Sequence, residues 1–180
     1  MRISLGTSPR TVSHEARRGN RRARVARSTL ATVFAITAGA VLAGCTQTVA
    51  LEPADNAIDV GCAEIIVRLP DTVSELEIRE TNAQGTAAWG TPTAVILRCG
   101  VAEPAPTSTL PCVLVDDVYW LRDDTNAPSY VFTTYGRSPA TEVIVNRDAV
   151  SPGVALYDLV GAVSFTTETG ACTEIEDSLG

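Results

Sequence analysis

The chain has 180 residues, with 14 arginines, no lysine, 21 acidic residues, one histidine and five cysteines, and its formal net charge is -7. Residues 1–44 carry eight arginines and one acid, giving +7, whereas residues 45–180 carry six arginines and 20 acids, giving -14. Because residues 45–180 lack histidine and lysine, they exclude a Ser-His-Asp or Cys-His nucleophile, a His-ligated metal and a lysine Schiff base. Their acidity also excludes nucleic acid as a partner, since binding it requires phosphates to be neutralised.

Residues 1–44 are predicted to form a lipoprotein signal peptide. A basic stretch precedes an apolar run of about fifteen residues, shorter than the roughly 20 residues that a membrane-spanning helix needs. The run ends in Leu42-Ala43-Gly44-Cys45, which resembles a bacterial lipobox. That resemblance implies that the Cys45 sulfur receives diacylglycerol and that the chain is cut before it. An uncleaved anchor helix is the alternative. The doublets Arg17-Arg18 and Arg21-Arg22 are compatible with twin-arginine export, but no apolar pair follows either of them closely, so general secretion is favoured.

The mature protein is therefore expected on the outer face of the cytoplasmic membrane, held there by the lipid on Cys45. Residues 45–61 have no sustained periodicity and are predicted to be a flexible tether spanning about 20–25 Å. The acidic domain beyond the tether would be repelled by an anionic bilayer.

The four cysteines that follow Cys45 are expected to form two disulfides, because an exported chain meets an oxidising environment. Of the three possible pairings, we favour Cys99–Cys112, which closes a short loop, and Cys62–Cys172, which joins the two ends of the domain. A zinc site is the competing use, but the chain has no CxxC pair and no histidine in this region.

Residues 62–172 are predicted to form a single α+β domain, followed by an acidic tail over 173–180. The spacing of Cys62, Ile65, Ile66 and Leu69 predicts a helix that stops at Pro70. Strands are then expected over 74–81, 93–99, 112–115, 118–122, 130–135 and 141–146. A second helix follows from Ser151-Pro152, and Gly161 within it indicates close packing. The order of these elements predicts a two-layer sandwich with an antiparallel sheet of about five strands.

Five short motifs stand out: Leu69-Pro70 after Cys62, Ala87-Ala88-Trp89-Gly90, Leu97-Arg98-Cys99-Gly100, Val118-Tyr119-Trp120 and Thr133-Thr134-Tyr135-Gly136-Arg137. Together they resemble a family of actinobacterial exported lipoproteins of unknown function. The resemblance covers about residues 60–165 together with the lipobox. It implies export and a shared fold, and it brings no catalytic residue with it.

Three sets of residues are candidate sites. Arg79, Arg98 and Arg137 would bind a carboxylate or phosphate if they met on one sheet face; otherwise each pairs with a surface acid. Trp89 and Trp120 would stack on a sugar or peptide, or else belong to the core. The third set consists of four aspartates, Asp116, Asp117, Asp123 and Asp124. They would bind Ca²⁺ or act as a glycosidase-like acid/base pair; otherwise they are solvated surface residues.

The sequence thus predicts a lipid-anchored cell-envelope domain that binds a partner protein or a wall glycan without catalysis and without a cofactor. The alternative is a carboxylate-dependent hydrolase that acts on an envelope substrate.

Overall fold

The computed structural model describes residues 47–106 and 109–176. The predicted signal peptide and Cys45 lie outside these residues. The helices are α2 (Val60–Ile66) and α3 (Pro152–Val163). The strands are β1 (Thr72–Val73), β2 (Leu76–Arg79), β3 (Thr86–Trp89), β4 (Val95–Val101), β5 (Cys112–Val115), β6 (Val118–Asp123), β7 (Ser129–Thr134), β8 (Arg137–Ser138), β9 (Ala140–Asn146) and β10 (Thr167–Glu168).

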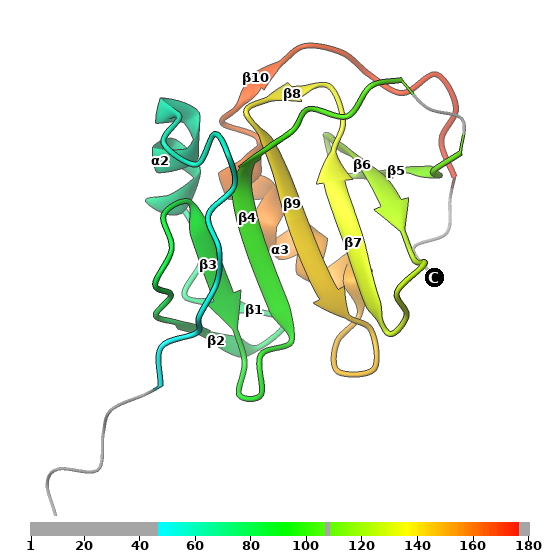
Figure 1. Cartoon of the computed structure of the whole chain (residues 1–180). Coiled ribbons are helices and arrows are strands. Elements are labelled where there is room, and N and C mark those ends of the chain that lie inside the picture. The colour runs from blue at the N-terminus through cyan, green and yellow to red at the C-terminus, as the bar shows by residue number, and fades with distance from the viewer. Residues whose placement is uncertain (1–46, 107–108, 177–180) are drawn as a thin grey trace, which may run out of the picture. The chain divides into compact units, whose positions relative to one another are not determined.

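Eight strands form one antiparallel sheet in the order β1-β2-β3-β4-β9-β7-β6-β5, and β8 pairs with β10 separately (Figure 1). The α+β class and the antiparallel sheet are confirmed, but the expected number of about five strands is wrong. The strand predicted over 74–81 is shorter in the structure, where β2 covers Leu76–Arg79. Ser74 and Glu75, with φ angles of 50° and 64°, instead form the turn between β1 and β2. Strand β3 was not predicted, because Ala87-Ala88-Trp89 is buried throughout and shows no alternation.

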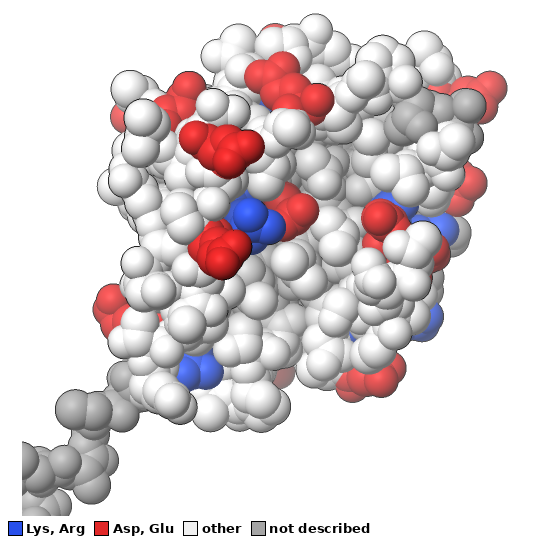
Figure 2. Space-filling view, viewed as in Figure 1, with Lys and Arg blue, Asp and Glu red and all other residues white. Residues whose placement is uncertain are grey.

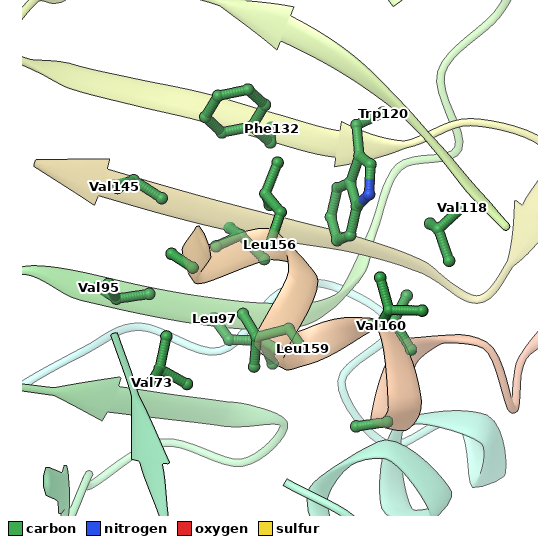
Figure 3. Close-up of a cluster of buried hydrophobic side chains, with 14 of the residues drawn as sticks. Val73, Val95, Leu97, Val118, Trp120, Phe132, Val145, Leu156, Leu159 and Val160 are labelled. Carbon is green, nitrogen blue, oxygen red and sulfur yellow. The ribbon is translucent and has the colours of Figure 1, made fainter. Parts of the chain in front are cut away.

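The core lies between the sheet and α3. Alternate residues of the central strands, such as Val95 and Leu97 of β4, are fully buried on the side that α3 covers. Figure 3 shows Leu156 and Leu159 of α3 directed toward these strand side chains. The predicted second helix is confirmed, because its apolar residues recur on one face and Pro152 occupies its first turn.

Gly161 does not mark close packing, contrary to the expectation from the sequence. A Cβ added there would have no heavy atom within 4 Å. The residue is exposed on the outer side of α3, so the space that a small residue leaves there is open.

The segment before α2 is bound to the domain. The Val49 amide donates to the Glu80 carbonyl (2.8 Å), and the Asn82 amide donates to the Val49 carbonyl (3.3 Å). Further on, the Asn56 amide donates to the Gly100 carbonyl (3.0 Å). Residues 47–59, which lie in the expected tether, are thus held to the domain by hydrogen bonds.

The disulfides join Cys62 to Cys99 and Cys112 to Cys172, so the favoured pairing is wrong. Cys99 lies in β4 and Cys112 in β5, four strand positions apart in the sheet, or about 19 Å at the usual strand spacing. Each bond therefore joins cysteines that are consecutive along the chain, Cys62 with Cys99 and Cys112 with Cys172. The first fastens α2 to the centre of the sheet, and the second fastens the C-terminal segment to the edge strand β5.

The first part of the acidic tail continues along that edge. The Glu176 amide donates to the Cys112 carbonyl at 2.7 Å. The carboxylate of Glu176 also lies 3.8 Å from the Arg122 guanidinium. The two contacts hold the chain after Cys172 against β5 and its neighbour β6.

Candidate functional site

The three arginines of the predicted anion site do not converge. Arg79 and Arg98 lie on the sheet face away from α3, as the strand register requires. Arg98 forms an ion pair with Glu142 of the neighbouring strand at 3.1 Å. The Arg79 guanidinium donates to backbone and hydroxyl oxygens, including the Gly90 carbonyl at 3.2 Å. On the face shown in Figure 2, no group of basic side chains gathers without acidic neighbours.

Arg137 is a buried structural residue. Its guanidinium donates to three carbonyl oxygens, those of Ser164 (3.1 Å), Thr166 (3.0 Å) and Asp117 (3.1 Å). Ser164 is the C-cap of α3, where the helix dipole favours a positive charge. Arg137 therefore connects the end of α3 to the turn between β5 and β6, and its donors are directed at the protein instead of a ligand.

The tryptophans belong to the core, so the ligand-stacking hypothesis is wrong. Trp89 and Trp120 are both fully buried. The Trp89 indole donates to the Pro70 carbonyl at 3.2 Å. Within the described residues, the Trp120 indole nitrogen has no hydrogen-bond partner. Neither ring presents a face to solvent.

The aspartates lie at the two ends of β6. Asp116 and Asp117 form the turn before the strand, whereas Asp123 and Asp124 lie at its far end, about 20 Å away along an extended chain. Retaining or inverting glycosidases need their carboxyl groups within about 5–9.5 Å. Hydrogen bonds from the Thr125 hydroxyl (2.7 Å) and amide (3.0 Å) lower the pKa of Asp123, which disfavours a proton-donating role.

No metal centre is formed by the residues that the structure describes: they contain no group of three or more His, Cys, Asp or Glu side chains placed to hold an ion. The paired aspartates therefore do not assemble the calcium site considered from the sequence.

The strongest candidate site is a groove between α2 and the hairpin that joins β2 to β3. Its volume of about 650 Å³ lies within the range of ligand pockets. One wall is formed by the segment 57–59 and by α2 with the residues after it, and the other by residues 78–87. Most of its side chains are aliphatic; they are Ala57, Ile58, Ala63, Ile66, Val67, Leu69, Ile78, Ala83 and Ala87.

The groove is apolar because α2 is short. Only Cys62 and Ile65 of this helix are buried against the domain. Ile58 and Val67, just outside its two ends, are 80% and 75% exposed, and Ile78 on the opposite wall is 40% exposed. We refer to these three side chains as the groove rim. Large aliphatic side chains around a concave surface are typical of a binding site.

Sequence reasoning did not find this groove. Ile78 belongs to the strand predicted over 74–81, and in the structure its side chain is 40% exposed. Ile58 was assigned to the tether. The only signal in the sequence was the pair of branched apolar residues, Ile58 and Val60, in a segment otherwise interpreted as flexible.

A second cavity of about 580 Å³ lies beside the Cys112–Cys172 disulfide. The segments 109–112 and 171–176 line it, together with Pro106, Leu121 and Tyr135. Its lining is more polar than apolar, unlike that of the groove, so it is a weaker candidate.

None of the described helices is long and apolar enough to cross a membrane. No curated protein and no solved structure matches this chain. Residues 26–172 match the family described as "Protein of unknown function (DUF3515)". Since this match spans well over half of the chain, the protein belongs to that family, and the expectation of a family of unknown function is confirmed.

Proposed function

We propose that this protein is a lipid-anchored component of the cell envelope whose domain binds a partner protein or another envelope component without transforming it. Diacylglycerol on Cys45 would hold it to the outer face of the cytoplasmic membrane. The observation that carries the binding role is the apolar groove between α2 and the β2–β3 hairpin, with its exposed rim of Ile58, Val67 and Ile78.

The cysteine pairing supports export and lipidation. The two disulfides use all four cysteines after position 45, and neither uses Cys45. Disulfides form and persist outside the reducing cytosol. Cys45 is thus left available at the end of the lipobox-like motif, where a thiol is required to accept the lipid.

The chemistry of the groove supports binding over catalysis. Its ionisable lining residues are Asp59, Arg79 and Glu80. The Asp59 carboxylate accepts a hydrogen bond from the Gly61 amide at the start of α2, and the Arg79 guanidinium donates to the Gly90 carbonyl and the Thr93 hydroxyl, so both act within the fold. A glycan partner is disfavoured because such ligands stack on exposed aromatic rings, and the groove lining contains no aromatic side chain. An apolar group on the partner is what the groove would bury.

Lipidation is tested by mass spectrometry of the protein purified from membranes. We expect a mature chain that begins at acylated Cys45, together with the disulfide-linked peptide pairs 62–99 and 112–172. Cys45→Ser should leave the precursor uncut or release the domain. A mature protein that starts at Met1 without lipid would refute the anchor.

Binding is tested by crosslinking in intact envelopes followed by recovery of the full-length protein. Ile78→Glu places a charge in the groove, whereas Leu114→Glu is a matched control, because Leu114 is a strand residue of nearly equal exposure (41%) outside the groove. We expect the first variant to lose crosslinked partners and the second to keep them. Equal recovery by both variants would exclude the groove as the binding site.

A further inference from the structure

We infer that the groove binds one acyl chain of a bilayer lipid. This inference rests on the proposed function, because it identifies the chemical class of ligand for the same site. Three observations carry it: where the chain enters the domain, what lines the groove, and which backbone groups are available beside it.

The first observation is that only a few residues separate the predicted lipidation site from a residue hydrogen-bonded to the groove wall. Val49 is hydrogen-bonded to Glu80, a groove residue, and Cys45 precedes Val49 by four residues. Even fully extended, four residues span at most about 14 Å. The docked segment 47–59 therefore replaces the expected tether of about 20–25 Å. With lipid on Cys45, the groove would stand at the bilayer surface, where lipid is the most abundant apolar molecule.

The second observation is the lining. The aliphatic walls require no polar group from the ligand, and burying hydrocarbon against them is favourable in proportion to the area removed from water. Several polar atoms nearby already have partners: Nη1 of Arg79 donates to Gly90 and Thr93, and the Thr86 hydroxyl donates to the Ala83 carbonyl. An unbranched hydrocarbon chain matches this environment better than a ligand that must form hydrogen bonds.

The third observation disfavours an extended peptide. Strand β2 is paired on both sides, with β1 and with β3. Thr81, just beyond it, is bridged to Val49. The hairpin wall therefore offers no free strand edge to which a peptide could add by backbone hydrogen bonds.

The test uses the domain 46–180, secreted into an oxidising compartment so that both disulfides form. This part of the chain is a compact unit that contains the whole described core. The protein is incubated with vesicles of phosphatidylcholine, whose zwitterionic surface removes the charge repulsion expected from an acidic domain, and is then re-isolated by gel filtration. Bound lipid is extracted and quantified, and native mass spectrometry gives the stoichiometry.

We expect about one lipid per protein molecule for the wild type. Ile78→Glu should reduce the captured lipid at least about tenfold, because it introduces a charge into the apolar groove. Ala63→Trp should do the same by filling the groove from an exposed position of α2. Leu114→Glu should remain within about twofold of the wild type, because it lies outside the groove. Near-UV circular dichroism identifies any variant that fails to fold. If one of the two groove variants does not fold, the other still tests the inference.

Absence of captured lipid in the wild type, or equal capture by wild type and folded Ile78→Glu, would overturn the inference. Lipid found only in the full-length protein that carries acylated Cys45 would also overturn it, since the occupant would then be the protein's own anchor. A partner protein lost from Ile78→Glu in envelopes, with no lipid captured from vesicles, would overturn the inference yet retain the proposed function. Conversely, an unlipidated Cys45 would refute the anchor whatever the vesicle experiment shows.

Discussion

Removing the Arg137 guanidinium should destabilise the domain more than any exposed arginine does. Arg137→Met keeps the aliphatic stem but deletes every donor. The carbonyls of Ser164, Thr166 and Asp117 then lose their partner in a region that is almost closed to water. The positive charge at the C-terminal end of α3 is lost as well.

The size of the effect follows from those contacts. A hydrogen bond from a charged donor contributes about 1.5–3 kcal/mol, but bonds that share one guanidinium are not additive, and water will reach some of the freed carbonyls. We therefore expect Arg137→Met to lower the free energy of unfolding by about 3–5 kcal/mol. Arg137→Lys keeps the charge but cannot reproduce the planar set of donors, so it should recover only part of this loss.

The assay is urea denaturation with the disulfides intact, followed by tryptophan fluorescence, because both tryptophans are buried and report on the core. A lower midpoint with an unchanged slope would indicate lost stability instead of an altered denatured state. Arg68→Met is the control. Arg68 is partly exposed and pairs with Glu64 on the surface, so its loss should cost less than about 1 kcal/mol. If the Arg137 variant were no less stable than the Arg68 variant, the structural role assigned to Arg137 would be refuted.

Three further changes test other parts of the fold. Gly161→Ala should stabilise the domain by about 0.5–1 kcal/mol, because α3 gains a better helix former and the added methyl group meets no neighbour; a loss of stability in urea would contradict the open space seen there. Gly100→Ala should release residues 47–59 to proteolysis, since Gly100 has a φ of +85° and its Cβ would lie 2.3 Å from the Asn56 carbonyl carbon; an unchanged digestion rate would show that the segment is not docked. Thr125→Val should raise the pKa of Asp123 toward its ordinary value by removing the hydroxyl hydrogen bond, as followed by NMR titration. Because the native pKa is the lower one, the stability linked to Asp123 is present above the carboxyl's unfolded pKa and is lost as the pH falls through the native value.

The parts of the fold that depend on local signals were predictable from the sequence. The helix of residues 152–163 carries its signals within itself: a proline in its first turn and a buried stripe that includes Leu156 and Leu159. The strands observed as β4, β5, β6, β7 and β9 also lie close to their predicted positions, because each contains a run of β-branched or aromatic residues.

The disulfide pairing was not predictable in this way, because it depends on strand order. Cys99 and Cys112 are separated by thirteen positions in the chain, which made a local loop the natural interpretation. The chain instead places β5 at the far edge of the sheet, and Cys99 meets Cys62 from α2. Nothing in the spacing of four cysteines distinguishes these arrangements.

The candidate site was missed for a related reason. Tryptophan and arginine were chosen as candidate ligand-binding residues because their side chains bind many kinds of ligand. In the structure, however, Trp89, Trp120 and Arg137 are all buried inside the domain. The groove is formed instead by side chains with no individual signature, and it exists only because a short helix and a hairpin leave aliphatic surface uncovered between them. Such a site results from how the elements pack against one another, so it cannot be predicted from the types of individual residues.

The same short segment determines both the shape of the groove and its distance from the predicted anchor. Ala57 and Asp59 form part of the groove wall, whereas Val49 and Asn56, in the same stretch, are hydrogen-bonded to the β2–β3 hairpin and to β4. Detaching this stretch would therefore open one wall and, at the same time, lengthen the connection to Cys45. If Cys45 is lipidated and the groove binds lipid, as proposed above, the site would benefit from this coupling, because the conformation that completes the groove would also keep it close to the bilayer.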